Sequence, residues 1–198
     1  MTTESARIYF DLIDPLSYLV AKELDGFEDL PGLTWRPFEL RPPPTPMTTS
    51  DDPALAGRWR VARDAGPGVG FAPGELVPWT RKAHELLLHA PPDRADTLRL
   101  RVFEAYLLEG RDIGRVDVLV ELARSAGLDA TATKAVLDVD RHEADVLSAR
   151  LEADADDITD TPVIVRGRRR LEGFHNRTAL GTFLRYATAT IDDPNGTH

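Results

Sequence analysis

The sequence predicts a mixed α/β fold in which a helical segment interrupts one α/β domain. Three observations predict it: a strand, a helix and a strand open the chain, a series of helical patterns follows, and two strands and a helix close it. Because strands and helices of this kind build one sheet covered by helices, the first and last parts should meet in space. We therefore expect one domain from residues 1–47 plus 141–198, with an all-helical domain inserted at 48–140.

The opening elements are a strand, a helix and a second strand. Residues 6–13 are rich in β-branched and aromatic side chains, which predicts a strand. Asp14 then precedes a proline. Because Asp is a favoured N-cap and Pro suits the first helical position, a helix should start here and end near residue 25. Residues 33–40 predict the second strand, and Pro37 within it predicts an edge position or a bulge.

The middle of the chain is predicted to be helical. Residues 41–53 carry five prolines, which favours an extended connector. Residues 66–78 are rich in glycine and proline and predict a loop. Helical periodicity, punctuated by glycines, predicts helices over 52–65, 79–90, 94–109, 115–126, 131–138 and 141–154.

The last elements are predicted to be a hairpin and a helix. A strand is expected over residues 161–165, a turn at Gly167 and Arg168, and a partner strand over 169–172. An amphipathic pattern over 176–190 predicts the final helix.

Composition excludes several classes of function. The chain contains no cysteine, so the protein itself supplies no disulfide, thiolate nucleophile or dithiol redox pair. A net charge of −9 argues against nucleic acid or an anionic membrane as partner. No apolar run approaches the ~20 residues of a membrane span, and no signal-peptide pattern opens the chain, so we expect a cytoplasmic protein. His84 and His89 are five residues apart and diverge on a helix, so no metal site is expected.

The order of the elements and several motifs resemble the DsbA-like branch of the thioredoxin fold, in particular its FrnE-type members. The motifs cover nearly the whole chain in order; they are Phe10-Asp11-Leu12-Ile13-Asp14-Pro15-Leu16-Ser17-Tyr18-Leu19, Ala83-His84, Phe103-Glu104-Ala105-Tyr106, Glu109-Gly110-Arg111-Asp112-Ile113-Gly114 and Thr161-Pro162. The resemblance implies a thioredoxin-like fold with an inserted helical domain. It also implies a cis peptide bond at Thr161–Pro162, packed against the first turn of the helix that Asp14 caps.

The sequence departs from the family at the two positions where the family carries its reactive cysteines. Asp14 stands where the family has its nucleophilic cysteine, and Ser17 stands where it has the second one. The related 2-hydroxychromene-2-carboxylate isomerases and kappa-class glutathione transferases have serine at the first position and use the thiol of glutathione. In all of these relatives the N-terminus of the helix stabilises a thiolate. We expect Asp14 to be ionised there, with its pKa lowered by the same N–H groups, and to repel a thiolate.

The resemblance makes Asp14 and Ser17 the candidates for the catalytic position, each with a structural alternative. Asp14 is a plain N-cap, or it binds a cationic ligand group or positions water. Ser17 bonds locally in the first turn, or its hydroxyl holds a ligand.

Four further residues are candidates for ligand binding. Thr161 and Pro162 shape the loop, and relatives use the backbone there to hold peptide or glutathione. Trp79 and Arg41 would line a cleft between the inserted domain and the thioredoxin-like domain; the alternatives are a packed tryptophan and a solvated arginine.

Two functional hypotheses follow from the resemblance. In the first, the protein is a family member without redox cysteines that binds a small or peptide-like ligand in the cleft and performs no dithiol chemistry. In the second, it is an enzyme of the isomerase or glutathione transferase type that uses glutathione or another low-molecular thiol. The charge of Asp14 favours an uncharged or cationic ligand over a thiolate. The sequence names no cofactor and leaves open whether the protein is a homodimer.

Overall fold

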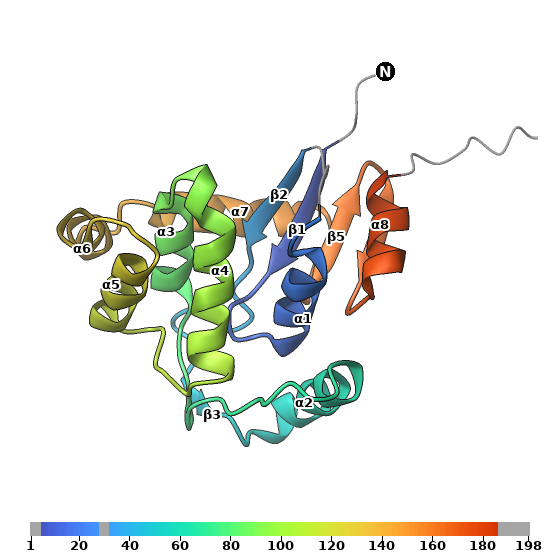
Figure 1. Cartoon of the computed structure of the whole chain (residues 1–198), viewed down its shortest axis with the longest axis horizontal. Coiled ribbons are helices and arrows are strands. Elements are labelled where there is room, and N and C mark those ends of the chain that lie inside the picture. Colours follow the sequence, from blue (N-terminus) through green and yellow to red (C-terminus); the bar gives the residue numbers. More distant parts are fainter. Residues whose placement is uncertain (1–4, 28–31, 186–198) are drawn as a thin grey trace, which may run out of the picture.

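The computed structural model describes residues 5–27 and 32–185. A four-stranded sheet with strand order β2-β1-β5-β6 lies at its centre (Figure 1). β1 pairs in parallel with β2 and antiparallel with β5, and β5 pairs antiparallel with β6. The first and last parts of the chain therefore share one sheet, as the sequence predicts. The four strands are β1 (Ala6–Phe10), β2 (Leu33–Pro37), β5 (Val163–Arg166) and β6 (Arg169–Glu172).

Strand β2 lies at one edge of the sheet and is shorter than predicted. The pattern predicted a strand over 33–40, but the strand ends at Pro37. Proline has no backbone N–H to donate to a strand ladder, so it is tolerated at an edge and at a strand end. The edge position is the one that Pro37 predicted.

Two apolar clusters lie on opposite faces of the sheet because successive side chains of a strand point to opposite sides. Ile8 and Phe10 of β1 belong to the larger cluster, together with α1 (Pro15–Leu24) and α8 (Arg177–Arg185). Tyr9 belongs to the smaller cluster, which packs on α7 (Glu143–Ala155). The sheet is thus covered by helices on both faces.

The segment between β2 and α7 is mainly helical. It includes one element that the sequence did not predict, a two-stranded antiparallel ribbon of β3 and β4 inside the predicted connector and loop. In Figure 1, α2 lies apart from the bundle of α3 to α6, below α1. The division at residues 48 and 140 into two domains stays a prediction. The elements are β3 (Thr48–Thr49), α2 (Pro53–Ala65), β4 (Leu76–Val77), α3 (Arg81–His89), α4 (Pro92–Leu107), α5 (Val116–Ser125) and α6 (Ala130–Asp138).

The last predicted helix is present as α8, which reaches Arg185. Residues 186–190 of that prediction lie outside the described residues. Within the described part of the chain, no helix combines the length and apolarity needed to cross a membrane.

Candidate functional site

The site at the start of α1 is built around the side chain of Asp14. Asp14 caps the helix, and Pro15 occupies its first position. The carboxylate oxygens accept hydrogen bonds from the backbone N–H groups of Leu16 (3.1 Å) and Ser17 (3.0 Å). Because these N–H groups have no partner within the helix, an Asp cap satisfies them. The first turn of α1 is therefore occupied by a carboxylate of the chain itself.

Three more donors converge on the same carboxylate. The hydroxyl of Ser17 lies 2.5 Å from Oδ2, the hydroxyl of Thr161 lies 3.0 Å from it, and Nη1 of Arg58 lies 2.8 Å from Oδ1. The Asp14 side chain is fully buried. All five partners are donors, which is the arrangement that satisfies an ionised carboxylate.

Arg58 enters the site from α2, which passes the N-terminal end of α1 (Figure 1). Its Nη1 also donates to the backbone oxygen of Thr161 (2.8 Å), and its Nη2 donates to the carboxylate of Asp160. The backbone N–H of Thr161 donates to Asp160 as well (2.7 Å). The polar backbone atoms of Thr161 are therefore bonded within the chain.

Burial raises the pKa of Asp14 above the ordinary value of an aspartate. The charge of Arg58, and hydrogen bonds from Ser17, Arg58 and Thr161, act in the opposite direction. The sequence prediction of a lowered pKa is wrong because it considered the N–H groups and the helix dipole, and not the complete burial of the carboxylate. Both oxygens of Asp14 already accept hydrogen bonds from the chain, and solvent does not reach them. This carboxylate is therefore poorly placed to act as a general base.

An open groove of about 330 Å³ lies next to this buried cluster. One wall is a face of α2 made by residues three or four apart, which share one side of a helix. The opposite wall is the loop of Thr161 and Pro162, whose connecting peptide bond is cis, with the start of β5. The lining residues are Leu16, Ala54, Gly57, Arg58, Val61, Asp160, Thr161, Pro162, Val163, Glu172 and Gly173.

The structure brings four of the six candidate residues together. Asp14, Ser17 and Thr161 share hydrogen bonds, and Pro162 lines the groove. It does not bring Trp79 and Arg41 to the groove. Both side chains instead bind the proline-rich connector.

Trp79 and Arg41 bind two neighbouring backbone carbonyls. Trp79 Nε1 donates to the oxygen of Thr45 and Arg41 Nη2 donates to that of Pro46, each over 2.9 Å. A proline-rich segment has few N–H groups of its own and depends on such external donors. These two side chains therefore order the connector and lie outside the lining of the groove.

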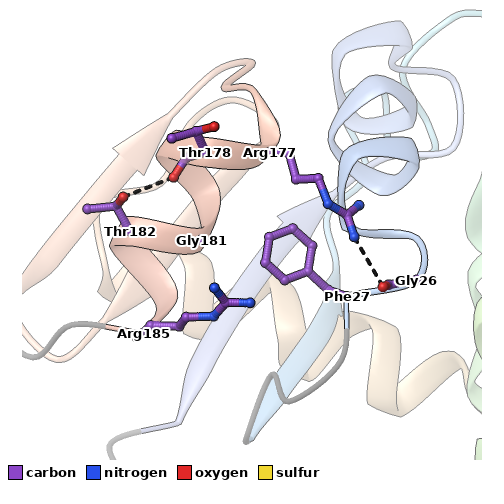
Figure 2. Close-up of a pocket in the computed structure, with 7 residues that line it drawn as sticks. All are labelled: Gly26, Phe27, Arg177, Thr178, Gly181, Thr182 and Arg185. Carbon is purple, nitrogen blue, oxygen red and sulfur yellow. Dashed lines mark hydrogen bonds between the residues drawn. The ribbon is translucent and has the colours of Figure 1, made fainter.

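A larger pocket, of about 480 Å³, lies at the opposite end of α1. Figure 2 shows the ring of Phe27 beside the guanidinium groups of Arg177 and Arg185, which lie 4.2 and 5.2 Å from the ring centroid. Arg177 donates to the backbone oxygens of Glu23, Asp25 and Gly26. Because these are the carbonyls that end α1, Arg177 acts as a cap of that helix. The pocket is remote from the Asp14 cluster.

No group of three or more His, Asp or Glu side chains that could hold a metal ion exists in the described ranges. His84, one of the two histidines considered above, is fully buried on α3, beside the ring of Phe10.

Comparison with known proteins places this geometry in a family. The model of the family described as DSBA-like thioredoxin domain matches residues 7–184. Among curated proteins, the uncharacterized protein YwbO of Bacillus subtilis is 27% identical over 183 residues, which are 86% of this chain and 90% of YwbO.

Solved structures show the same fold. The probable DsbA oxidoreductase SCO1869 of Streptomyces coelicolor has a TM-score of 0.73 and 22% identity, over 96% of this chain and 94% of its own. The cytosolic disulfide reductase DsbM of Pseudomonas aeruginosa, solved with GSH, has a TM-score of 0.66 and 19% identity, over 92% and 100% of the two chains. A 2-hydroxychromene-2-carboxylate isomerase has a TM-score of 0.62 and 16% identity, over 90% and 91%.

The sequence did not identify Arg58 as a site residue. It lies 44 residues from Asp14 in the chain, in a helix where an arginine is ordinarily solvated. Its neighbours on the same face of the helix, Ala54, Gly57 and Val61, are exposed along the groove, so they gave no signal that Arg58 is part of a buried cluster.

Proposed function

The chain belongs to the DSBA-like thioredoxin domain family, and from this premise we propose that it binds a peptide-like or other small ligand in the groove beside α2, without thiol chemistry. It contains no cysteine, so it cannot perform dithiol exchange by itself. The observation that carries the proposal is that the buried Asp14 carboxylate has no room for a ligand, whereas the groove beside it does. Five donors of the chain itself already bind that carboxylate, and the groove is open.

The charges around the groove favour an uncharged or cationic ligand. Two carboxylates, those of Asp160 and Glu172, and the guanidinium of Arg58 are the charged groups that line the groove, and Arg58 is already paired with the buried Asp14 beside it. Glu172 also pairs with Arg170 at 3.4 Å, on the exposed surface, where such a pair contributes little. The apolar lining includes Val61, whose side chain is exposed. A ligand with apolar groups and a basic group fits this lining.

The second candidate function is an enzyme of the isomerase or glutathione transferase type that uses an external thiol. The similarity to DsbM, a protein solved with GSH, favours it. The geometry of this chain opposes it, because the first-turn N–H groups of Leu16 and Ser17 already donate to Asp14. A cytoplasmic location and a homodimer also stay predictions.

We expect the purified protein to reduce insulin no faster than a buffer blank containing the same dithiothreitol. The double variant Asp14→Cys/Ser17→Cys is the positive control. Arg58 and the first-turn N–H groups should stabilise a thiolate at position 14, as they now stabilise a carboxylate. Insulin reduction above the blank by the cysteine-free protein would contradict the absence of thiol chemistry.

The groove itself is tested with two peptides that differ only in their central residue, acetyl-Leu-Lys-Leu-amide with a net charge of about +1 and acetyl-Leu-Glu-Leu-amide with about −1. We expect the lysine peptide to bind at least about threefold more tightly than the glutamate peptide at low salt, because the groove carries excess negative charge. Amide chemical shifts of ¹⁵N-labelled protein measure the affinities and map the contacts. Equal binding, or shifts only outside the groove, would refute the proposed site.

Gly57→Gln provides a variant that fills the groove without disturbing the fold. A Cβ at Gly57 meets no atom within 4 Å, and the helix interior favours Gln over Gly by about 0.5–1 kcal/mol. We expect this variant to lose the peptide-induced shifts. The matched control is Gly70→Gln, since a Cβ at Gly70 also meets nothing within 4 Å and Gly70 does not line the groove.

A further inference from the structure

The pocket of Figure 2 differs in charge from the rest of this acidic protein. Two of its lining side chains are arginines, Arg177 and Arg185, and none is a carboxylate. Four other cavities of the described residues each have at least one carboxylate in their lining, in a protein whose net charge is −9. A pocket lined by two cations and by no carboxylate attracts anions.

This pocket lies along one face of α8. The lining residues of that helix are spaced so that they share one side of it over about two turns, with an arginine at each end and Gly181 in the middle. A Cβ at position 181 would lie 3.2 Å from Cζ of Phe27, so the glycine allows the phenyl ring to rest against the helix. The lining residues of α8 are Arg177, Thr178, Gly181, Thr182 and Arg185.

The ring of Phe27 holds both guanidinium groups without neutralising their charge. The guanidinium carbon of Arg177 lies 4.2 Å from the ring centroid and that of Arg185 lies 5.2 Å from it, so the sum of these distances is the most that can separate the two. Figure 2 shows them on different sides of the ring. Contact with the face of an aromatic ring orients a guanidinium and leaves its N–H groups available to a ligand.

Both guanidinium groups have N–H donors that no residue of the described chain uses. Arg177 donates three of its five N–H groups to the backbone oxygens that end α1, which leaves the Nε–H and one N–H of Nη2. Arg185 has no hydrogen bond or ion pair with any described residue. The carboxylate of Glu23 accepts the backbone N–H of Arg177 over 2.8 Å and forms no ion pair with either guanidinium. The backbone bonds hold Arg177 in place, so a ligand meets a side chain that is already ordered.

We propose that this pocket binds a small dicarboxylate, with one carboxylate paired to Arg177 and the other to Arg185. The N–H groups of a planar guanidinium match the two oxygens of a carboxylate. Because the ring lies between the two guanidinium groups, a ligand with two acidic groups and a short spacer reaches both, whereas a compact anion reaches one at a time. Between the arginines the lining combines two threonines with a phenyl ring, which suits a short spacer. This pocket is remote from the groove beside α2, and the two proposals stand or fall independently.

Succinate, adipate and suberate are the probes, and butyrate, hexanoate and octanoate are monocarboxylate controls of the same chain lengths. Titration of ¹⁵N-labelled wild-type protein at neutral pH and low salt, followed by amide chemical shifts, measures the affinities and maps the contacts. We expect the best dicarboxylate to bind at least about fivefold more tightly than its matched monocarboxylate, because it forms a second ion pair, and to shift amides of α8.

Three results would overturn the proposal. They are the absence of binding at millimolar concentration, equal binding within every matched pair of acids, and shifts that lie only outside α8. Inorganic phosphate is the further control, since binding as tight as that of the best dicarboxylate would show that one compact anion is sufficient and would contradict the need for two acidic groups.

Arg185→Gln tests the second ion pair, with Arg124→Gln as the matched control. Both arginines lie in the last turn of their helices, α8 and α5, and neither side chain has a hydrogen bond or ion pair with a described residue. Each substitution therefore removes the same charge and the same interaction with a helix dipole. We expect Arg185→Gln to lose the preference for the dicarboxylate and Arg124→Gln to retain it. If Arg185→Gln keeps the preference, the proposal fails. The matched acids on the wild-type protein decide the proposal even if this variant does not fold.

Discussion

Replacing Asp14 with alanine should lower the free energy of unfolding by about 3 kcal/mol, the loss typical when one partner of a buried ion pair is removed. The variant deprives five donors of their acceptor. It also leaves the guanidinium of Arg58, whose side chain is 17% exposed, with only Asp160 and a backbone oxygen. Urea unfolding at neutral pH, followed by circular dichroism, measures the change.

Asp129→Ala is the matched control for this experiment. Asp129 caps α6 by accepting from the N–H of Ala132 (2.7 Å), and it lies at the exposed surface. Loss of a plain N-cap costs about 1 kcal/mol. If Asp14→Ala and Asp129→Ala lose the same free energy, then Asp14 is only a cap and its pairing with Arg58 contributes nothing measurable.

Asp14→Ser should convert the closed cluster into a site for a thiolate. Serine caps a helix with one neutral oxygen where aspartate uses two charged ones, so it would free one first-turn N–H group and the face of Arg58 that now meets Asp14, while Arg58 keeps its pair with Asp160. We expect glutathione to bind this variant at least about tenfold more tightly than the wild type. Calorimetric titration of both proteins at low salt measures the ratio.

The reason for this expectation differs from the one that the sequence suggested. The sequence predicted that the charge of Asp14 repels thiolates. The structure shows that Arg58 balances that charge, so the obstacle to a thiolate is that its position is filled. Arg58→Met in the Asp14→Ser background should therefore abolish the gain. Glutathione binding by the wild type as tight as by Asp14→Ser would restore the thiol-dependent alternative.

Hydrophobic periodicity and capping residues were sufficient to predict most elements of this fold. Alternation along Ile8, Tyr9 and Phe10 gives β1 two buried faces, and Asp14 starts α1 at the predicted residue. The ribbon of β3 and β4 could not be predicted in the same way. Each of its strands has two residues, and they pair across 26 residues of intervening chain, so tertiary contacts create them and local pattern does not.

Only those residues of the candidate site that lie in motifs shared with the family could be predicted from the sequence. Asp14, Ser17 and Thr161 occupy motif positions, and they meet in the structure. Arg58 lies outside every motif, and its role depends on how α2 lies against α1. The sequence assigned Trp79 to the cleft, whereas its indole N–H donates to a backbone oxygen of the proline-rich connector.

The most direct measurement of the central claim, that Asp14 and Arg58 form a buried pair at the start of α1, is a double-mutant cycle. Unfolding free energies of the wild type, Asp14→Ala, Arg58→Met and the double variant give the coupling between the two side chains. We predict a favourable coupling of about 2 kcal/mol or more, so that the double variant is more stable than the two single losses imply. Additivity within about 0.5 kcal/mol would show that the two side chains do not act as a pair, and would contradict the claim.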